Sequence, residues 1–200
     1  MRLSTLATVT AAATATVLMP GAGLAAAAPP AAAPAARAVL ADHTFDYESG
    51  TEGWIAKKDD KLRDGDVTWS TDLAKSGTHS LDFWLDGPGD GTLWVERGFP
   101  VPLGQPSITV ELSVWEWNDG DDEATNWPII AHVDRTAPTH EEDFVKLGLG
   151  RTQVDGWRQY TYSTTIDVHD VRTFYVAYGV SVGAERSRAH YFDLAHVTIT

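Results

Sequence analysis

Tryptophans at alternate positions of extended runs are the residues of this sequence best suited to chemistry, and that chemistry is binding. Within residues 79–85, Leu81, Phe83 and Leu85 share one face of an extended chain, and Trp84 lies on the other. An outward indole offers a flat apolar surface to the C–H face of a sugar ring, while nearby polar side chains bond the sugar hydroxyls. The alternation therefore makes Trp84 a candidate sugar contact.

The run 107–117 repeats this arrangement over a longer stretch. Val110, Leu112 and Val114 share one face, so Trp115 and Trp117 are expected on the opposite face together with polar residues. Outward tryptophans on polar faces are unusual, because tryptophan is highly buried on average. The candidate sugar-binding residues of the whole sequence are Trp84, Trp94, Trp115, Trp117 and Trp127. The alternative for each is packing at a sheet edge or sandwich end, the role expected of Trp54, Trp69 and Trp157.

Catalytic patterns are weak by comparison. The sequence has no cysteine, no G-x-S-x-G motif before a helix, and seven histidines without zinc-ligand spacing. A glycosidase needs two carboxyl groups across a cleft, and Glu96, Glu111 and Glu116 cannot be paired from the sequence. We therefore assign no catalytic residue, although a secreted jelly-roll lyase or glycosidase remains an alternative.

Charge limits the partners of the chain. The sequence carries 28 Asp and Glu against 15 Lys and Arg, for a net charge of −13. Such an acidic protein repels nucleic acid and anionic membrane surfaces. We expect neither as a partner.

The N-terminal segment predicts export. Arg2 precedes an uncharged apolar run that is too short to span a membrane, and small residues follow Pro20. We interpret residues 1–28 as a signal peptide and the Ala/Pro-rich residues 29–42 as a linker. Residues 43–200 then form one secreted, extracellular domain.

Short alternating runs predict the architecture of that domain. The expected strands are 43–48, 67–70, 79–85, 92–97, 107–117, 129–134, 144–149, 158–164, 173–182 and 190–200. Ten strands are too many for one open sheet of this size, and no long amphipathic helix is present. The sequence therefore predicts an all-β fold, a two-sheet antiparallel β-sandwich of the jelly-roll type.

Three segments carry a resemblance to a known superfamily: 45–54 (FDYESGTEGW), 74–83 (AKSGTHSLDF) and 191–199 (YFDLAHVTI). Together they resemble jelly-roll carbohydrate-binding modules, galactose-binding-like β-sandwiches that accompany bacterial polysaccharide-degrading enzymes. The resemblance implies a jelly roll that binds a polysaccharide or oligosaccharide without catalysis. The other alternative is an extracellular protein-interaction module on the same sandwich. We expect a monomer.

The same resemblance implies a structural calcium ion. In these modules an acid at the end of the first strand, carbonyls of the loop before the Ser-Leu strand, and an aspartate of the final strand surround the metal. The corresponding residues are Glu48 with Asp46, Lys75 and its neighbours, and Asp193. Many relatives carry two adjacent aspartates in the final strand, whereas Leu194 follows Asp193 here.

Cleavage of the signal peptide can be tested directly. The pattern over residues 1–28 predicts that the exported protein begins between Ala25 and Ala38. Amino-terminal sequencing of protein collected from the medium reads this position. Recovery of a chain that still starts at Met1 would contradict the prediction of export.

Overall fold

The computed structural model describes residues 37–85, 90–118, 128–149, 156–183 and 188–200 of the 200-residue chain. These residues form strands and one short 3₁₀ turn: β1 (Ala41–Phe45), β2 (Ile55–Lys58), β3 (Gly65–Ser70), β4 (Ser80–Leu85), β5 (Asp90–Pro100), β6 (Ser107–Asn118), β7 (Pro128–Asp134), η1 (Glu141–Asp143), β8 (Val145–Leu149), β9 (Gly156–Asp167), β10 (Thr173–Gly183) and β11 (Arg188–Ile199). None of the described residues forms a helix long and apolar enough to span a membrane.

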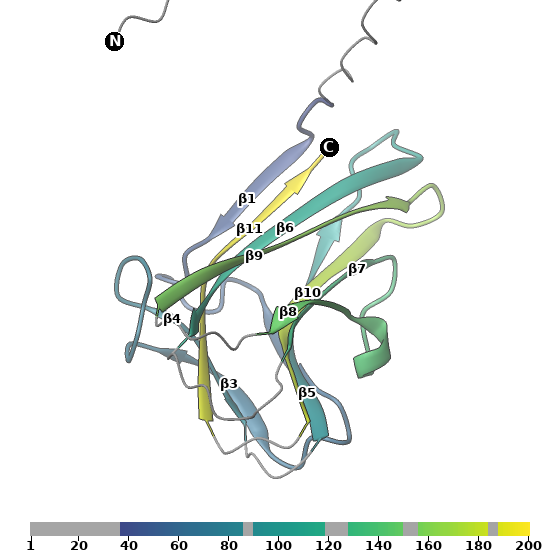
Figure 1. Ribbon diagram of the computed structural model, residues 1–200. Coiled ribbons are helices and arrows are strands. Elements are labelled where there is room, and N and C mark those ends of the chain that lie inside the picture. The colour runs from purple at the N-terminus through teal and green to yellow at the C-terminus, as the bar shows by residue number, and fades with distance from the viewer. Residues whose placement is uncertain (1–36, 86–89, 119–127, 150–155, 184–187) are drawn as a thin grey trace, which may run out of the picture. The chain divides into compact units, whose positions relative to one another are not determined.

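Two antiparallel sheets pack against each other. Sheet A has the strand order β3-β4-β11-β6-β9, and β1 also pairs with β11. Sheet B has the order β2-β5-β10-β7-β8. In Figure 1 the strands of sheet A lie toward the left and those of sheet B toward the right. The predicted two-sheet β-sandwich of the jelly-roll type is confirmed.

All ten strands expected from alternation are present, and their bounds shift by a few residues. The first strand begins at Ala41, two residues before the expected start at His43. The strand that the sequence did not indicate is β2, in which all four residues are exposed. A strand with no buried face has no alternation of apolar and polar residues, so the sequence carried no signal for it.

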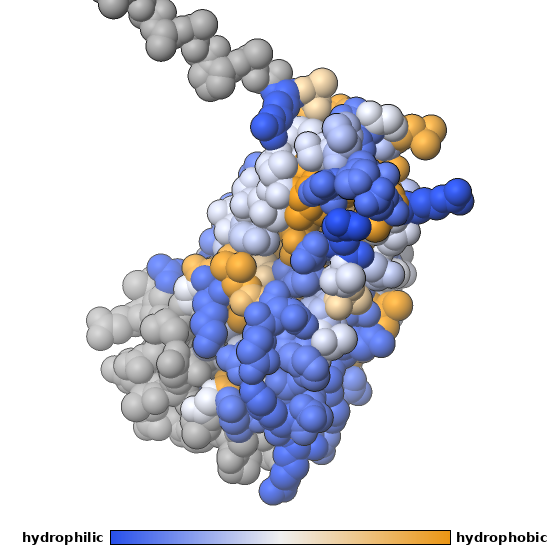
Figure 2. All heavy atoms as spheres, turned by 90° about the vertical axis from the view of Figure 1, so that its right-hand side faces the viewer, coloured by the Kyte–Doolittle hydropathy of each residue, from blue (hydrophilic) through white to orange (hydrophobic). Residues whose placement is uncertain are grey.

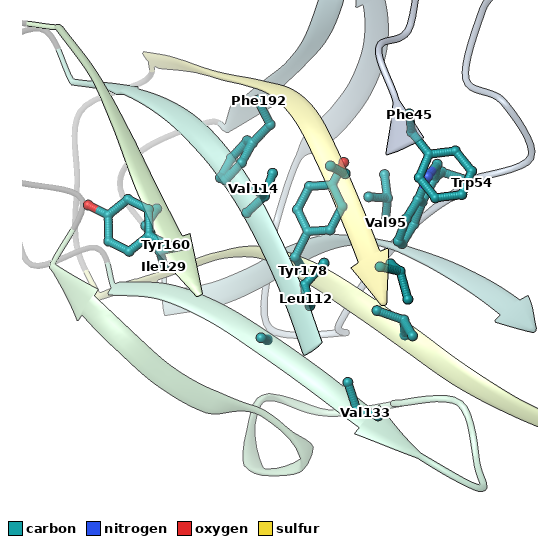
Figure 3. Close-up of a cluster of buried hydrophobic side chains, with 14 of the residues drawn as sticks. Phe45, Trp54, Val95, Leu112, Val114, Ile129, Val133, Tyr160, Tyr178 and Phe192 are labelled. Atoms are coloured by element: carbon teal, nitrogen blue, oxygen red, sulfur yellow. The ribbon is translucent and has the colours of Figure 1, made fainter. Parts of the chain in front are cut away.

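The core between the sheets is rich in aromatic rings. Tyr178 of β10 contacts Trp54 at 5.0 Å and Phe192 of β11 at 5.5 Å between ring centroids, and Phe83 of β4 packs on Phe192 at 4.6 Å. Figure 3 shows Trp54, Tyr178 and Phe192 among aliphatic side chains of both sheets, such as Leu112, Val95 and Ile129. The residues expected to point inward are buried: Leu81, Phe83, Leu85, Leu93, Val95, Val110, Leu112 and Val114.

One glycine permits the close approach of two central strands of sheet B. Gly179 of β10 is paired with Trp94 of β5. A Cβ atom on Gly179 would lie 2.1 Å from the carbonyl oxygen of Leu93 and 2.6 Å from the Cα atom of Trp94. Any side chain here would force β5 away from β10.

This contact predicts a contrast between two glycines of β10. Gly179→Ala should lower the free energy of unfolding by about 1–3 kcal/mol, as overpacked sites do. Gly183→Ala is the matched control, because its Cβ atom would meet only a carboxylate oxygen of Asp90 at 3.9 Å. Urea unfolding measures both variants. Equal stability of the two would show that β5 and β10 are not in this close contact.

Candidate functional site

Three of the predicted sugar-binding tryptophans lie on the outer face of sheet A. Trp84 is on β4, and Trp115 and Trp117 are on β6. Their inward neighbours Phe83 and Val114 are buried in the core, so the alternation of strand side chains turns the indoles outward. Trp84 is 40% exposed, the others half-buried.

Two further aromatic residues lie on the same face. Trp157 of β9 is paired with Trp117, and their rings meet edge to face at 5.9 Å. Tyr191 of β11 is paired with Asp82 of β4 and also points outward. We call Trp84, Trp115, Trp117, Trp157 and Tyr191 the aromatic surface. It crosses the four neighbouring strands β4, β11, β6 and β9, roughly 14 Å at the usual strand spacing.

Carboxylates lie beside Trp84 on this surface. Asp66 of β3 is the cross-strand partner of Trp84, and Asp82 precedes it by two residues on the same face. Partial burial and the nearby charge of Asp72 raise the pKa of Asp82. Its Oδ1 atom has no hydrogen-bond partner within the described part of the chain. Asp82 therefore keeps acceptor capacity next to two aromatic rings, Trp84 and Tyr191.

The polar residues around Trp115 are a lysine and a glutamine, not carboxylates. Lys75 places its ammonium 3.8 Å from the centre of the Trp115 ring, a cation–π contact that covers one side of the indole. Gln159 of β9 is the cross-strand partner of Trp115. The aromatic surface thus has acids at its β4 end and a cation and an amide near its middle.

Trp94, another of the predicted sugar-binding tryptophans, does not join this surface. Trp94 has the expected outward orientation, but it lies on sheet B, on the opposite side of the sandwich, and is only 2% exposed. It is buried because Phe144 packs against its ring at 5.3 Å, a contact that alternation along β5 could not indicate. Trp127 lies outside the described residues.

The tryptophans expected to pack have mixed locations. Trp54 is buried in the core, whereas Trp69 is 46% exposed and stacks on His79 at 4.0 Å. Trp157 was expected to pack but belongs to the aromatic surface. Trp157 is three residues from Tyr160 in the run W-R-Q-Y-T-Y, so the two side chains lie on opposite faces of the strand. Because Tyr160 points into the core, this spacing could have placed Trp157 on the outer face.

Three of the residues predicted to surround calcium, Glu48, Lys75 and Asp193, meet at the loop before β4. Asp193 Oδ2 accepts hydrogen bonds from the backbone N–H groups of Lys75 at 2.8 Å and Ser76 at 3.0 Å. Glu48 Oε1 accepts from the N–H groups of Thr78 and His79, both at 2.8 Å. Both chain ends of the domain are thereby tied to one loop.

The resemblance implied that carbonyl oxygens of the loop face these residues, whereas the loop presents backbone N–H groups to Glu48 and Asp193. Asp46 was expected beside Glu48 at the same site, but it lies apart from the loop. Asp46 accepts the N–H of Glu48 at 3.1 Å and has no contact with the loop in the described hydrogen bonds. The hydrogen bonds to Glu48 lower its pKa to about 2. Burial raises the pKa of Asp193, and the charge of Glu48 adds to this shift.

Gly77 allows the loop to wrap around Glu48. Its φ angle is +64°, which favours glycine, and a Cβ atom would lie 2.4 Å from Glu48 Oε1. The described residues contain no cluster of three or more His, Cys, Asp or Glu side chains arranged to hold a metal. A cation at this junction would therefore depend on the two carboxylates together with backbone oxygens.

The three glutamates considered for glycosidase chemistry do not lie across one cleft from each other. Glu96 lies on the outer face of sheet B, and Glu111 is exposed on sheet A. Glu116 points into the sandwich, is fully buried, and lies 3.7 Å from Nδ1 of buried His190. The three glutamates thus lie on the outer face of sheet B, on the outer face of sheet A and between the sheets.

Solved structures with the same architecture are carbohydrate-binding modules. A xylan-binding domain of family 22 aligns with a TM-score of 0.52 at 16% identity, covering 78% of this chain and 93% of that one. The CBM22-2 xylan-binding domain of Paenibacillus barcinonensis Xyn10C has a TM-score of 0.50 at 14% identity, covering 79% and 99%. The C-terminal family 22 module of Clostridium thermocellum Xyn10B has a TM-score of 0.50 at 17% identity, covering 78% and 92%.

The chain therefore has the β-sandwich jelly-roll fold of carbohydrate-binding modules. No family model matches the sequence, and no curated protein matches it. At identities this low the likeness concerns the fold, and the ligand has to be inferred from the surface of this chain itself.

Proposed function

We propose that this chain is a secreted, non-catalytic domain that binds a polysaccharide or oligosaccharide on the aromatic surface of sheet A. The observation that carries the proposal is the set of outward rings on four adjacent strands, interleaved with hydrogen-bonding side chains. Indoles provide apolar contact to sugar rings, and Asp82 and Gln159 provide directional contacts to hydroxyls.

The form of the surface favours an extended ligand. The aromatic surface spans several strands rather than lining an enclosed cavity, which suits a chain of sugar units. The rings alternate with polar groups such as Asp66 and Asp82, unlike the contiguous apolar patch that a protein interface presents. These carboxylates have no ion pair within the described part of the chain, so they favour neutral glycans over uronate-rich ones.

Glycan binding is tested by a glycan array followed by isothermal titration with the best oligosaccharide. Trp117→Ala and Trp84→Ala should each cost about 2–4 kcal/mol of binding free energy, as buried aromatic contacts do at interfaces. Ile55→Ala, an exposed hydrophobic residue of β2 in sheet B, is the matched control and should bind normally. Circular dichroism confirms that the variants are folded. Absence of binding to any glycan, or equal binding by all variants, would refute the proposed site.

We also propose that the junction of Glu48, Asp193 and the loop before β4 binds a calcium ion. Two carboxylates converge there, and Lys75 of the loop places its ammonium over the ring of Trp115. Calcium prefers carboxylate and carbonyl oxygens, so the two acids fit it in charge and donor type. Within the described part of the chain, Asp193 Oδ1 accepts one hydrogen bond, from the N–H of Leu194, and so keeps a lone pair for a ligand bond.

Calcium at this junction would stabilise the fold, because it would link both ends of the domain to one loop. At free calcium 100 times the dissociation constant, binding adds about 2.7 kcal/mol of stability. We expect a chelator to lower the melting temperature of wild type, calcium to restore it, and Asp193→Asn to remove the response. A melting temperature that is insensitive to both would contradict calcium binding at this junction and would leave the carboxylates to their hydrogen bonds with the loop.

A further inference from the structure

A buried carboxylate follows β2 at the edge of sheet B. β2 pairs with β5 as far as Lys58 and Leu93, so Asp59 comes to lie opposite Thr92. Asp59 N donates to the carbonyl oxygen of Thr92 at 3.0 Å, and Thr92 N donates to Asp59 Oδ1 at 3.1 Å. Oδ1 also accepts the N–H of Leu62 at 3.0 Å. Backbone groups thus hold the side chain of Asp59, which is only 3% exposed, in one position.

Each of these two paired residues has one buried oxygen atom without a hydrogen-bond partner. The atoms are Asp59 Oδ2 and Thr92 Oγ1, and neither has a partner within the described part of the chain. The side chain of Thr92 is fully buried. Burial of a polar atom is unfavourable unless the atom is bonded, and burial of a charged one is more so. The two oxygens therefore mark a position where a bound group stabilises the protein.

The charge of Asp59 has no ion-pair partner among the described residues. Lys61, two residues further along, places its Nζ atom 3.4 Å from Glu142. Lys58, the preceding residue, places its Nζ atom 3.9 Å from Asp64. Buried charges in proteins are paired or coordinate a metal. Because neither neighbouring lysine pairs with Asp59, the bound group has to bring positive charge.

A polar cavity lies next to this pair of residues. Ser181 of β10 is the cross-strand partner of Thr92. It lines a cavity of about 130 Å³ whose walls also carry Asp90, Glu141 and Lys146. Figure 2 views the side of the molecule on which sheet B lies, and the described surface there is mostly hydrophilic. Two acids against one base on its walls make the cavity a suitable approach for a small cation.

The donor atoms indicate which cation fits. Carboxylate and hydroxyl oxygens suit hard metal ions. Divalent calcium usually takes several carboxylates and carbonyls, whereas Asp59 belongs to no cluster of three or more His, Cys, Asp or Glu side chains in the part of the chain that the structure describes. One carboxylate balances one positive charge. The site therefore favours a monovalent ion over a divalent one.

We propose that Asp59 Oδ2 and Thr92 Oγ1 bind a monovalent metal cation, with sodium as the probe ion. The ion compensates the buried charge of Asp59 and bonds both oxygen atoms that the protein leaves without a partner. It stabilises the edge of sheet B, because Asp59 connects β5 to the loop that contains Leu62. The site is separate from glycan binding on sheet A and from the junction of Glu48 and Asp193.

The proposal is tested by urea unfolding in sodium chloride and in choline chloride at equal concentration, with a chelator in both buffers to remove calcium. Choline screens charge as sodium does, but it is a bulky organic cation that two buried oxygens cannot bind. At sodium about ten times its dissociation constant, the equilibrium constant of unfolding should be about elevenfold lower than in choline. Titration of sodium against choline should give a saturable curve.

Variants assign the response to these residues. Asp59→Asn keeps an oxygen for the backbone N–H groups but removes the charge, so it should unfold equally in both salts. Thr92→Val should weaken the sodium response, and Thr92→Ser should keep it. Asp60→Asn, which changes the exposed neighbouring carboxylate, is the matched control and should respond like wild type. Asp193→Asn should also keep the response, which separates this site from the proposed calcium site.

The wild-type comparison alone decides if Asp59→Asn does not fold. Equal stability of wild type in sodium and choline would overturn the proposal, and it is the result expected if a water molecule occupies the position. A sodium response that persists in Asp59→Asn, or that disappears in Asp60→Asn, would also overturn it.

Discussion

The burial of one face of each sheet is the constraint on which the other features depend. Strand side chains alternate, so packing Val114 and Leu112 into the core turns Trp115 and Trp117 outward. A register slip by one residue would bury the indoles and expose the aliphatic side chains, and the loss of core packing forbids it. The aromatic surface is therefore fixed by the same contacts that stabilise the sandwich.

A local irregularity of β11 connects the core to the loop before β4. The pairing of β11 with β6 shifts register between Asp193 and His196, and Leu194 has a positive φ of 51°. As a result the inward residues change from Phe192 to Ala195 and Val197, an odd step along the strand. The irregularity leaves Asp193 beneath the loop, where backbone N–H groups surround its carboxylate.

Alternation explains why so much of the architecture could be predicted and why some of it could not. Alternation identified the strands that have one buried face. It also identified Trp84, Trp115 and Trp117 as outward, because the neighbouring residues of their strands are apolar and buried. It did not indicate β2, which has no buried face, nor the burial of Trp94 against Phe144. Such contacts join residues distant in sequence, and the pattern within a strand carries no information about them.

The most direct test of glycan binding on sheet A is to map a bound oligosaccharide by NMR through the indole N–H signals of the tryptophans. Binding on the aromatic surface should shift the signals of Trp84, Trp115, Trp117 and Trp157. The signals of Trp54 in the core and Trp94 on sheet B should stay in place. The opposite pattern, with Trp94 shifted and the four sheet A indoles unchanged, would contradict the account.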